Sequence, residues 1–274
     1  MLTAVAAQSQ VRYFDRQADI ARSDSLIKTC KPGMTAPQRV DCIGRHLVGT
    51  PYVAHTLEAP AGQPEQLVIN LQQLDCTTFV ESVSALALAE NVSDFPRQLA
   101  ALRYRDGKGD GYASRLHYIA DWADHNVARG VLTDVAAAIP SHAVRTIDIN
   151  FMSGHRKSYP ALTDETEYAR ILEVENSLKA KSFAYIPKEK LFDPAVLEML
   201  NPGDIIAFVS YLPDLDVTHM GLIVSENGEL HALHASSANH KVEISEKTLP
   251  QFVQDNQYWT GIRVFRLSST PKQQ

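Results

Sequence analysis

One cysteine, Cys76, lies where an extended run changes into a helical one, in the segment LQQLDCTTFVESVSALALAE at positions 71–90. From Phe79 onward, apolar residues recur with the i, i+1, i+4, i+7, i+8 spacing of a helix face that is turned to a core. Asp75 is a favourable N-cap residue, so the helix is expected to begin at Cys76. Unpaired N–H groups and the positive end of the helix dipole favour a thiolate there. Cys76 is therefore a candidate nucleophile, with a buried structural thiol as the alternative.

Two of the ten histidines fall on one face of a predicted hairpin. Asn227-Gly228 is a strong signal for a two-residue turn, and counting outward from it sets His234 opposite Gly221. His219 and His234 then become diagonal neighbours, about 7–8 Å apart at Cα, with both rings on the same face. His231 falls on the opposite face. A bulge in the hairpin would exchange the roles of His231 and His234, so that alternative stays open.

These three side chains could together perform nucleophilic catalysis at a carbonyl carbon. Cys76 would attack as a thiolate, and His219 would keep it ionised and later protonate the leaving amine. His234 would hold His219 in the productive tautomer and orientation. Backbone N–H groups at the start of the helix would stabilise the oxyanion, assisted by the phenol of Tyr52. This chemistry needs no metal and no organic cofactor, and no other Cys/His cluster has the spacing of a structural zinc site.

The elements that must position these residues are predicted from apolar patterning and turn residues. A helix is expected over residues 10–30, and a second helix begins after Thr35 as N-cap and ends at Gly49. A short buried strand is expected at 67–69. Five strand candidates then follow one another and predict an antiparallel sheet, at 202–209, 217–224, 229–236, 241–245 and 258–267.

Composition excludes several classes of protein. The 274 residues are 45% apolar with a net charge of −6, and no basic stripe is available to neutralise nucleic-acid phosphates. No apolar run approaches the roughly 20 residues of a membrane-spanning helix. In an oxidising compartment Cys30 and Cys42 could pair and leave Cys76 as the free thiol, although spacing does not decide this. We find no sequence signal for the oligomeric state.

The extreme N-terminus suggests export. Residues 1–9 resemble the end of a secretory signal peptide, because Ala4-Val5-Ala6 offers small residues of the kind that a signal peptidase requires. A frayed Ala-rich terminus is the alternative. We expect an exported, periplasmic protein. Residues 10–270 lack a Pro/Gly/Ser-rich linker, so they are predicted to form one domain with an insertion at about 95–190.

Several motifs, in their order along the chain, resemble the NlpC/p60 superfamily of papain-like cysteine peptidases that act on bacterial cell walls. They are GTPY (49–52), LDCTTFVE (74–81), PGDIIAF (202–208), THMGLIV (218–224) and LHAS (233–236). The longer forms LVINLQQLDCTTFVE, INFMSGHRKSYPAL and LHASS are similar to the amidase branch, the N-acetylmuramoyl-L-alanine amidases. Thr77-Thr78 stands where most of the superfamily has Ser-Gly, and this departure also favours the amidase branch.

The resemblance implies an α+β, papain-like NlpC/p60 core in which the nucleophile helix packs on an antiparallel sheet. It implies Cys76, His219 and His234 as catalytic residues, and a muropeptide substrate cut between N-acetylmuramic acid and L-alanine. An endopeptidase that cuts within the stem peptide and a non-catalytic module that binds cell-wall fragments are the alternatives.

The insertion contains further candidates for binding the substrate. FMSGH (151–155) and Tyr159 resemble a motif of the amidase branch, and Ser153, His155 and Tyr159 could donate or accept hydrogen bonds to sugar or peptide. A solvated loop is the alternative for this segment. Tyr52 of the GTPY motif and Asp75, which directly precedes Cys76, complete the set of expected substrate-binding residues.

Overall fold

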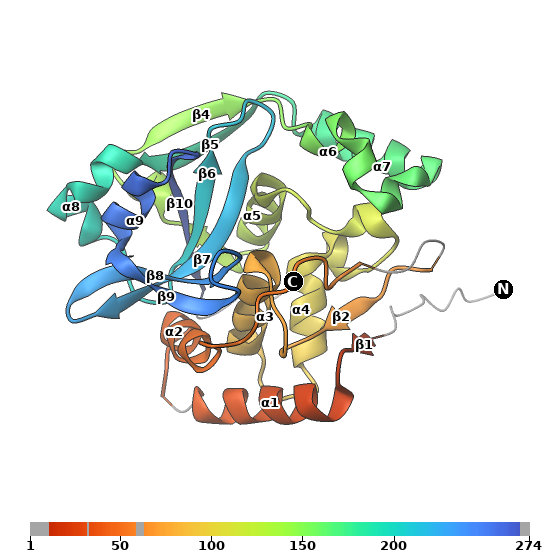
Figure 1. Cartoon of the computed structure of the whole chain (residues 1–274), viewed down its shortest axis with the longest axis horizontal. Coiled ribbons are helices and arrows are strands. Elements are labelled where there is room, and N and C mark those ends of the chain that lie inside the picture. The colour runs from red at the N-terminus through yellow and green to blue at the C-terminus, as the bar shows by residue number, and fades with distance from the viewer. Residues whose placement is uncertain (1–10, 32, 59–62, 269–274) are drawn as a thin grey trace.

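The computed structural model describes residues 11–31, 33–58 and 63–268, and their fold is α+β. The sheet strands are β3 (Leu132–Asp134), β4 (Ala143–Ile147), β5 (Lys181–Pro187), β6 (Ile205–Ser210), β7 (Val217–Glu226), β8 (Glu229–Ser236), β9 (Lys241–Thr248) and β10 (Trp259–Leu267). They form one eight-stranded antiparallel sheet in the order β4-β5-β10-β6-β7-β8-β9, with β3 paired to β10 (Figure 1). Two further strands, β1 (Val11–Tyr13) and β2 (Leu67–Ile69), make a separate parallel pair.

Nine α-helices accompany the sheet in the described part of the chain. They are α1 (Arg16–Thr29), α2 (Ala36–His46), α3 (Cys76–Leu88), α4 (Phe95–Arg103), α5 (Ile119–Ala128), α6 (Phe151–Gly154), α7 (Glu165–Ser177), α8 (Pro194–Leu197) and α9 (Leu249–Asp255). Short 3₁₀ helices lie between them, namely η1 (Arg105–Gly107), η2 (Tyr112–Ser114), η3 (Ala136–Ala138), η4 (Arg156–Ser158), η5 (Pro160–Thr163) and η6 (Lys188–Phe192).

The central strands are buried on both faces, and their side chains alternate between two cores as a strand period of two requires. Met220 and Leu222 of β7 belong to the core that is shared with α2, α3, α4 and α5. Ile223 of β7 and Phe208 of β6 belong to the core that is shared with α8 and α9. Figure 1 shows α3 and α4 on one side of the sheet and α8 and α9 on the other. A third cluster lies around α6 and α7.

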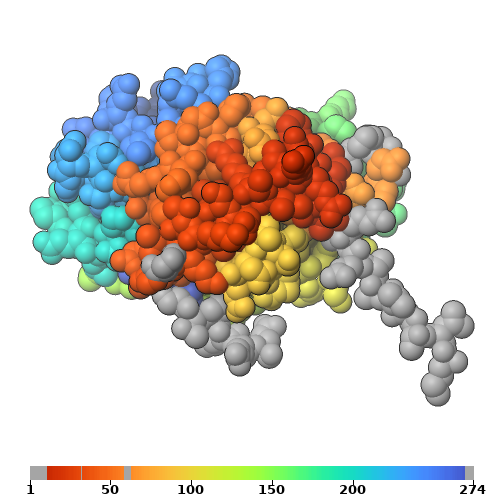
Figure 2. Space-filling view, turned by 90° about the horizontal axis from the view of Figure 1, so that it is seen from below, coloured from red at the N-terminus to blue at the C-terminus, as the bar shows by residue number. Residues whose placement is uncertain are grey.

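The N-terminal helices form one surface of the molecule, seen from below in Figure 2. The helix that was expected to begin near residue 10 begins at Arg16 instead, because Asp15 caps it by accepting from the Ala18 amide at 3.0 Å. Residues 11–13 pair with β2. The predicted cap of the second helix is confirmed, since Thr35 and Gln38 form a capping box.

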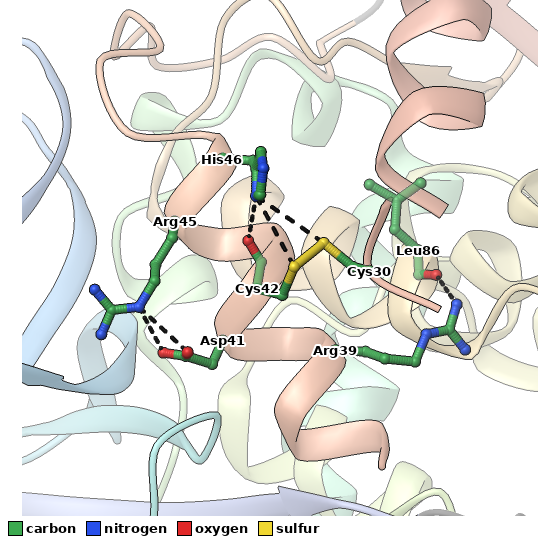
Figure 3. The surroundings of a disulfide bond; sticks show 7 residues. All are labelled: Cys30, Arg39, Asp41, Cys42, Arg45, His46 and Leu86. Carbon is green, nitrogen blue, oxygen red and sulfur yellow. Dashed lines mark hydrogen bonds and ion pairs between the residues drawn. A yellow bond between two sulfur atoms is a disulfide. The ribbon is translucent and has the colours of Figure 1, made fainter. Parts of the chain in front are cut away.

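A disulfide between Cys30 and Cys42 joins the end of α1 to α2, with the Cα atoms 5.8 Å apart (Figure 3). The pairing that spacing alone left open is therefore present. His46 lies beside it, with Nδ1 3.9–4.0 Å from the two sulfur atoms and 2.8 Å from the Cys42 carbonyl oxygen. Among the described residues Cys76 is the free cysteine.

The five C-terminal strands and the strand at 67–69 are confirmed, with ends that shift by a few residues. The segment 95–190 also contributes strands that patterning did not predict: β3, β4 and β5 extend the same sheet. No helix in the described ranges is long and apolar enough to cross a membrane. The predicted signal-peptide remnant at residues 1–9 lies outside the described residues.

Candidate active site

Cys76 is the first residue of α3, as predicted. The side chain of Asp75 caps the helix: its Oδ1 accepts from the Thr78 amide at 2.8 Å, and Thr78 Oγ1 in turn accepts from the Asp75 amide at 2.9 Å. The Thr78 hydroxyl also donates to Asp75 Oδ1 at 2.8 Å. The carboxylate of Asp75 is thereby engaged in holding the start of the helix. Its expected part in binding substrate is untested, whereas its capping role is confirmed.

The hairpin that carries the histidines has the predicted register. Glu226 pairs with Glu229 around Asn227 and Gly228, whose positive φ values of 51° and 87° suit a two-residue hairpin turn. His219 on β7 and His234 on β8 share one face and are joined by a 2.9 Å hydrogen bond between His219 Nε2 and His234 Nδ1.

His231 takes no part in this pair. Its Nδ1 lies 2.8 Å from the Ser245 carbonyl oxygen, and the pairing of β7 with β8 runs without a bulge from Glu226 to Leu222. The parity argument that separated His231 from His234 is therefore confirmed.

Close packing at Gly221 brings the two strands together at the histidine pair. A Cβ atom at this position would lie 2.9 Å from the Leu233 carbonyl oxygen and 3.1 Å from the Cβ of His234. Glycine thus permits a backbone approach that any side chain would prevent.

Aromatic rings surround the histidine pair on the face that α9 covers. The centroid of the His219 ring lies 5.3 Å from that of Phe208 and 6.0 Å from that of Trp259, with which it is parallel to within 3°. Phe208 and Trp259 stack on each other at 4.2 Å. The Phe252 ring of α9 lies 5.1 Å from that of His234. Sequence patterning placed Phe208 and Trp259 in predicted strands and made no assignment for Phe252. Their contact with the histidines depends on pairing between distant segments.

Cys76 approaches β7 from the start of α3. Its sulfur lies beside the Met220 backbone amide, one residue beyond His219, and 3.9 Å from Thr77 Oγ1. Burial raises the pKa of Tyr52, and the nearby Cys76 and Asp75 raise it further, so the half-buried phenol of Tyr52 belongs to the same neighbourhood. Among the described residues no hydrogen bond joins Cys76 to either histidine, and their direct contact stays a prediction.

Electrostatics at the sulfur differ from the sequence expectation. Burial, reinforced by Asp75, raises the pKa of the Cys76 thiol to about 11, although part of the residue's surface is open to solvent. The backbone amides of Met220 and Thr77 oppose this rise. The expectation of a lowered thiol pKa from the helix end is therefore wrong, because desolvation outweighs the first-turn amides.

Both imidazoles are neutral at neutral pH. Burial, with the neighbouring His234, lowers the pKa of His219 to about 3. Burial also lowers the pKa of His234 to about 4, partly offset by Glu243. A neutral thiol next to a strand that carries a neutral imidazole pair suits general-base chemistry, in which the proton moves as the sulfur attacks.

The predicted substrate-binding residues of the insertion lie on and after α6. Ser153 Oγ donates to the Asn150 carbonyl oxygen at 3.2 Å, and His155 is exposed and stacks on Phe151 at 4.1 Å. Tyr159 is half-buried. None of the hydrogen bonds of these side chains, within the described ranges, goes to Cys76, His219 or His234, so their substrate role stays a prediction.

Comparison with protein families gives one match over most of the chain. Residues 42–262 match the family AmiA-like, described as N-acetylmuramoyl-L-alanine amidase-like. A solved N-acetylmuramoyl-L-alanine amidase from Bacteroides uniformis is 41% identical, covers 92% of this chain and 99% of its own, and has a TM-score of 0.77.

Two other solved structures are also similar. A Bacteroides fragilis protein described as a putative xylanase is 42% identical, with coverage of 82% of this chain and 99% of its own and a TM-score of 0.76. A Legionella pneumophila protein of the family DUF1460 is 24% identical, with coverage of 92% and 95% and a TM-score of 0.71, which shows a shared fold. No curated protein matches the chain.

Proposed function

The chain belongs to the AmiA-like, N-acetylmuramoyl-L-alanine amidase-like family, and on that premise we propose that it hydrolyses the amide between N-acetylmuramic acid and L-alanine in muropeptides, with Cys76 as nucleophile. The observation that carries the mechanism is the 2.9 Å hydrogen bond between His219 and His234, with His219 next in sequence to Met220, whose backbone amide lies beside the Cys76 sulfur. Membership of this family implies peptidoglycan as the substrate.

The histidine pair determines which nitrogen can act as base. If Nε2 of His219 donates its proton to Nδ1 of His234, then Nδ1 of His219 is left as the free acceptor. A neutral His219 in this tautomer can take the thiol proton through Nδ1. The mechanism requires the sulfur and this nitrogen to come within hydrogen-bond reach in the substrate complex, where such contacts tighten.

The proposed reaction proceeds in two halves. As the Cys76 proton passes to His219, sulfur bonds to the lactyl carbonyl carbon and the oxyanion is stabilised by first-turn amides of α3 and by the Tyr52 phenol. The C–N bond then breaks, and the His219 proton goes to the departing L-alanine nitrogen. Water, deprotonated by His219, next attacks the thioester carbon. The C–S bond breaks, His219 returns its proton to the departing sulfur, and the muramic acid leaves with a carboxyl group that ionises in solvent.

We further propose that the protein is exported to the periplasm and has a papain-like core of the NlpC/p60 type. The Cys30–Cys42 disulfide supports export, because such bonds persist in oxidising compartments. The antiparallel sheet with a cysteine at the start of a packed helix supports the core assignment.

The test is release of stem peptide from a purified muropeptide by the wild-type protein and by Cys76→Ala. We expect the wild type to release a peptide that begins with L-alanine, identified by mass spectrometry, and Cys76→Ala to release none while keeping the wild-type circular dichroism spectrum. Release of peptides that begin at a later stem residue would assign the protein as an endopeptidase instead. Full turnover by Cys76→Ala would overturn the mechanism.

Variants of the histidines distinguish the role of the base from that of the orienting ring. His219→Ala should be almost as damaging as loss of the thiol, because it removes the base. His234→Ala should lower kcat less, because this ring orients His219 and transfers no proton. His231→Ala is the matched control on the same strand, and it should leave kcat near the wild-type value, since its ring bonds to Ser245 instead.

A further inference from the structure

A short connecting segment, residues 49–53, lies along the edge of the sheet. Its Gly49 amide donates to the Val242 carbonyl oxygen of β9 at 2.8 Å. Its Tyr52 amide donates to the His240 carbonyl oxygen, just before β9, at 2.9 Å. Because β9 pairs with β8, which contributes one member of the histidine pair, this edge belongs to the same sheet as the proposed base. The backbone that carries Tyr52 is therefore fixed to that sheet.

The connecting segment also contacts the chain that leads into α3. The Leu74 amide donates to the Pro51 carbonyl oxygen at 3.0 Å, and the Val53 amide donates to the Leu74 carbonyl oxygen at 3.1 Å. Leu74 lies two residues before Cys76. The place of the proposed oxyanion donor relative to the sulfur thus depends on how firmly this segment and the chain before α3 are held together.

One guanidinium group from α1 binds both of these parts. Arg22 donates through Nη1 to the carbonyl oxygen of Leu71, in the chain before α3, and through Nη2 to Thr50 Oγ1 of the connecting segment at 2.9 Å. Leu71 and Thr50 are both buried. A guanidinium presents its donors in a rigid planar fork, so two acceptors that bind the same fork are held at a fixed separation.

Asp19, about one turn earlier in α1, completes the arrangement. Asp19 is fully buried, and its Oδ1 accepts from the Leu71 amide at 2.9 Å. Both polar backbone groups of Leu71 are therefore bound by side chains of α1. The other carboxylate oxygen of Asp19 accepts from the Asp15 amide at 3.1 Å. Hydrogen bonds that involve an ionised group are shorter and stronger than neutral ones, which suits them to fixing a backbone position.

We propose that Arg22, held beside Asp19, is a positioning residue of the active site. It fixes the connecting segment against the chain before α3, so that the Tyr52 phenol and the first-turn amides of α3 face the same oxyanion. Arg22 touches no reacting atom. The inference rests on the proposed function, in which Tyr52 assists the oxyanion, and it adds a helix that supplies no catalytic group of its own.

The contact between Arg22 and Thr50 can be removed with little change of shape. Thr50→Val deletes the acceptor and keeps the branched side chain, and it should lower kcat for stem-peptide release by roughly three- to tenfold, the loss expected for one hydrogen bond, with KM near the wild-type value. Thr50→Ser keeps the hydroxyl and should restore the wild-type kcat. Arg22→Met removes the fork itself and should lower kcat at least as much as Thr50→Val does.

A double variant separates positioning from a purely structural role. In a Tyr52→Phe background, Thr50→Val should cause little further loss of kcat, because the phenol that it displaces no longer donates a hydrogen bond. The fall in Tm caused by Thr50→Val should persist in that background. A side chain that only stabilises the fold would lower Tm in both backgrounds and leave kcat unchanged in both.

Arg39→Met is the matched control for Arg22→Met. Arg39 is also half-buried, and its guanidinium donates to the carbonyl oxygens of Leu86 and Ala89 at 3.0 and 2.9 Å. These acceptors lie at the end of α3 that is remote from Cys76, and Figure 3 shows the contact with Leu86. Arg39→Met should therefore lower Tm and leave kcat near the wild-type value.

The outcomes separate this inference from the proposed function. Wild-type kcat in both Thr50→Val and Arg22→Met would overturn it, as would a change confined to KM. It would also be overturned by losses of kcat that multiply when Thr50→Val and Tyr52→Phe are combined, or by a Tyr52→Phe variant with wild-type kcat. Failure of the proposed function has a different signature, namely full turnover by Cys76→Ala. A protein that is inactive as Cys76→Ala but insensitive to Arg22→Met keeps its nucleophile and loses only the positioning role.

Discussion

Gly221→Ala should weaken the hydrogen bond of the histidine pair from a position that carries no functional side chain. The new Cβ would lie 2.9 Å from the Leu233 carbonyl oxygen and 3.1 Å from the Cβ of His234. Ordinary C···O contacts begin at about 3.3 Å, so β7 and β8 must separate by about 0.4 Å. The 2.9 Å bond between His219 and His234 spans those two strands and would lengthen by a similar amount.

The expected size of the effect follows from these distances. Overpacking of this kind costs about 1–3 kcal/mol of unfolding free energy, which corresponds to a fall in Tm of roughly 2–12 °C. Weakening an orienting hydrogen bond worth about 0.5–1.5 kcal/mol should lower kcat/KM by about 2- to 13-fold. Because the nucleophile and base remain, the variant should stay measurably active.

The assay combines calorimetry with stem-peptide release, and Gly228→Ala serves as the control. Gly228 has a φ of 87° and no heavy atom within 4 Å of an added Cβ. Alanine there strains the same hairpin and lowers Tm through its backbone, without pressing on His234. It should therefore leave kcat/KM near the wild-type value.

A double variant makes the reasoning refutable. In a His234→Ala background, Gly221→Ala should cause little further loss of kcat/KM, because the interaction it disturbs is already gone. If Gly221→Ala lowers Tm as expected but leaves kcat/KM unchanged, or if its effect simply adds to that of His234→Ala, then His234 does not act through His219 and the orienting role fails.

Four other predictions concern protonation, which affects both activity and Tm, the disulfide and the oxyanion. Activity should be lost only as pH falls toward about 3–4, the lowered pKa values of His219 and His234, so kcat/KM at pH 5 should stay close to its value at pH 7. A histidine of ordinary pKa, about 6.5, would be only about 3% neutral at pH 5. A fall in kcat/KM between pH 7 and pH 6 would therefore contradict the burial of the pair. The same lowered pKa values mean that the unfolded chain binds more protons below pH 6.5, so Tm should fall as pH is lowered through that range. Replacing both Cys30 and Cys42 by Ala should lower the unfolding free energy by about 3 kcal/mol, because the disulfide closes a loop with a sequence separation of 12. The variant should keep the wild-type kcat at 25 °C. A marked fall in kcat would show that the disulfide also positions the active site. Tyr52→Phe should lower kcat by roughly tenfold or more with little change in KM, because it removes a hydrogen-bond donor to the oxyanion. A change confined to KM would assign the phenol to substrate binding instead.

Local sequence determined the parts of the site that depend on neighbouring residues. The start of α3 follows from Asp75 and Thr78, which cap it within four residues. The shared face of His219 and His234 follows from the Asn227-Gly228 turn, because a two-residue hairpin permits one register and a strand alternates its side chains with a period of two. Both devices act through backbone geometry that a short segment contains in full.

Only the tertiary structure decided what surrounds those residues. The aromatic rings around the histidine pair come from β6, α9 and β10, whose packing against one another no short segment specifies. The direction of the Cys76 pKa shift depends on how much protein encloses the sulfur, and this desolvation outweighed the local helix-end effect. The disulfide likewise required α1 and α2 to bring two Cα atoms within 5.8 Å. Burial and long-range approach are properties of the packed chain, so the candidate residues could be named from sequence, while the ionisation of the thiol and the rings around the histidines could not.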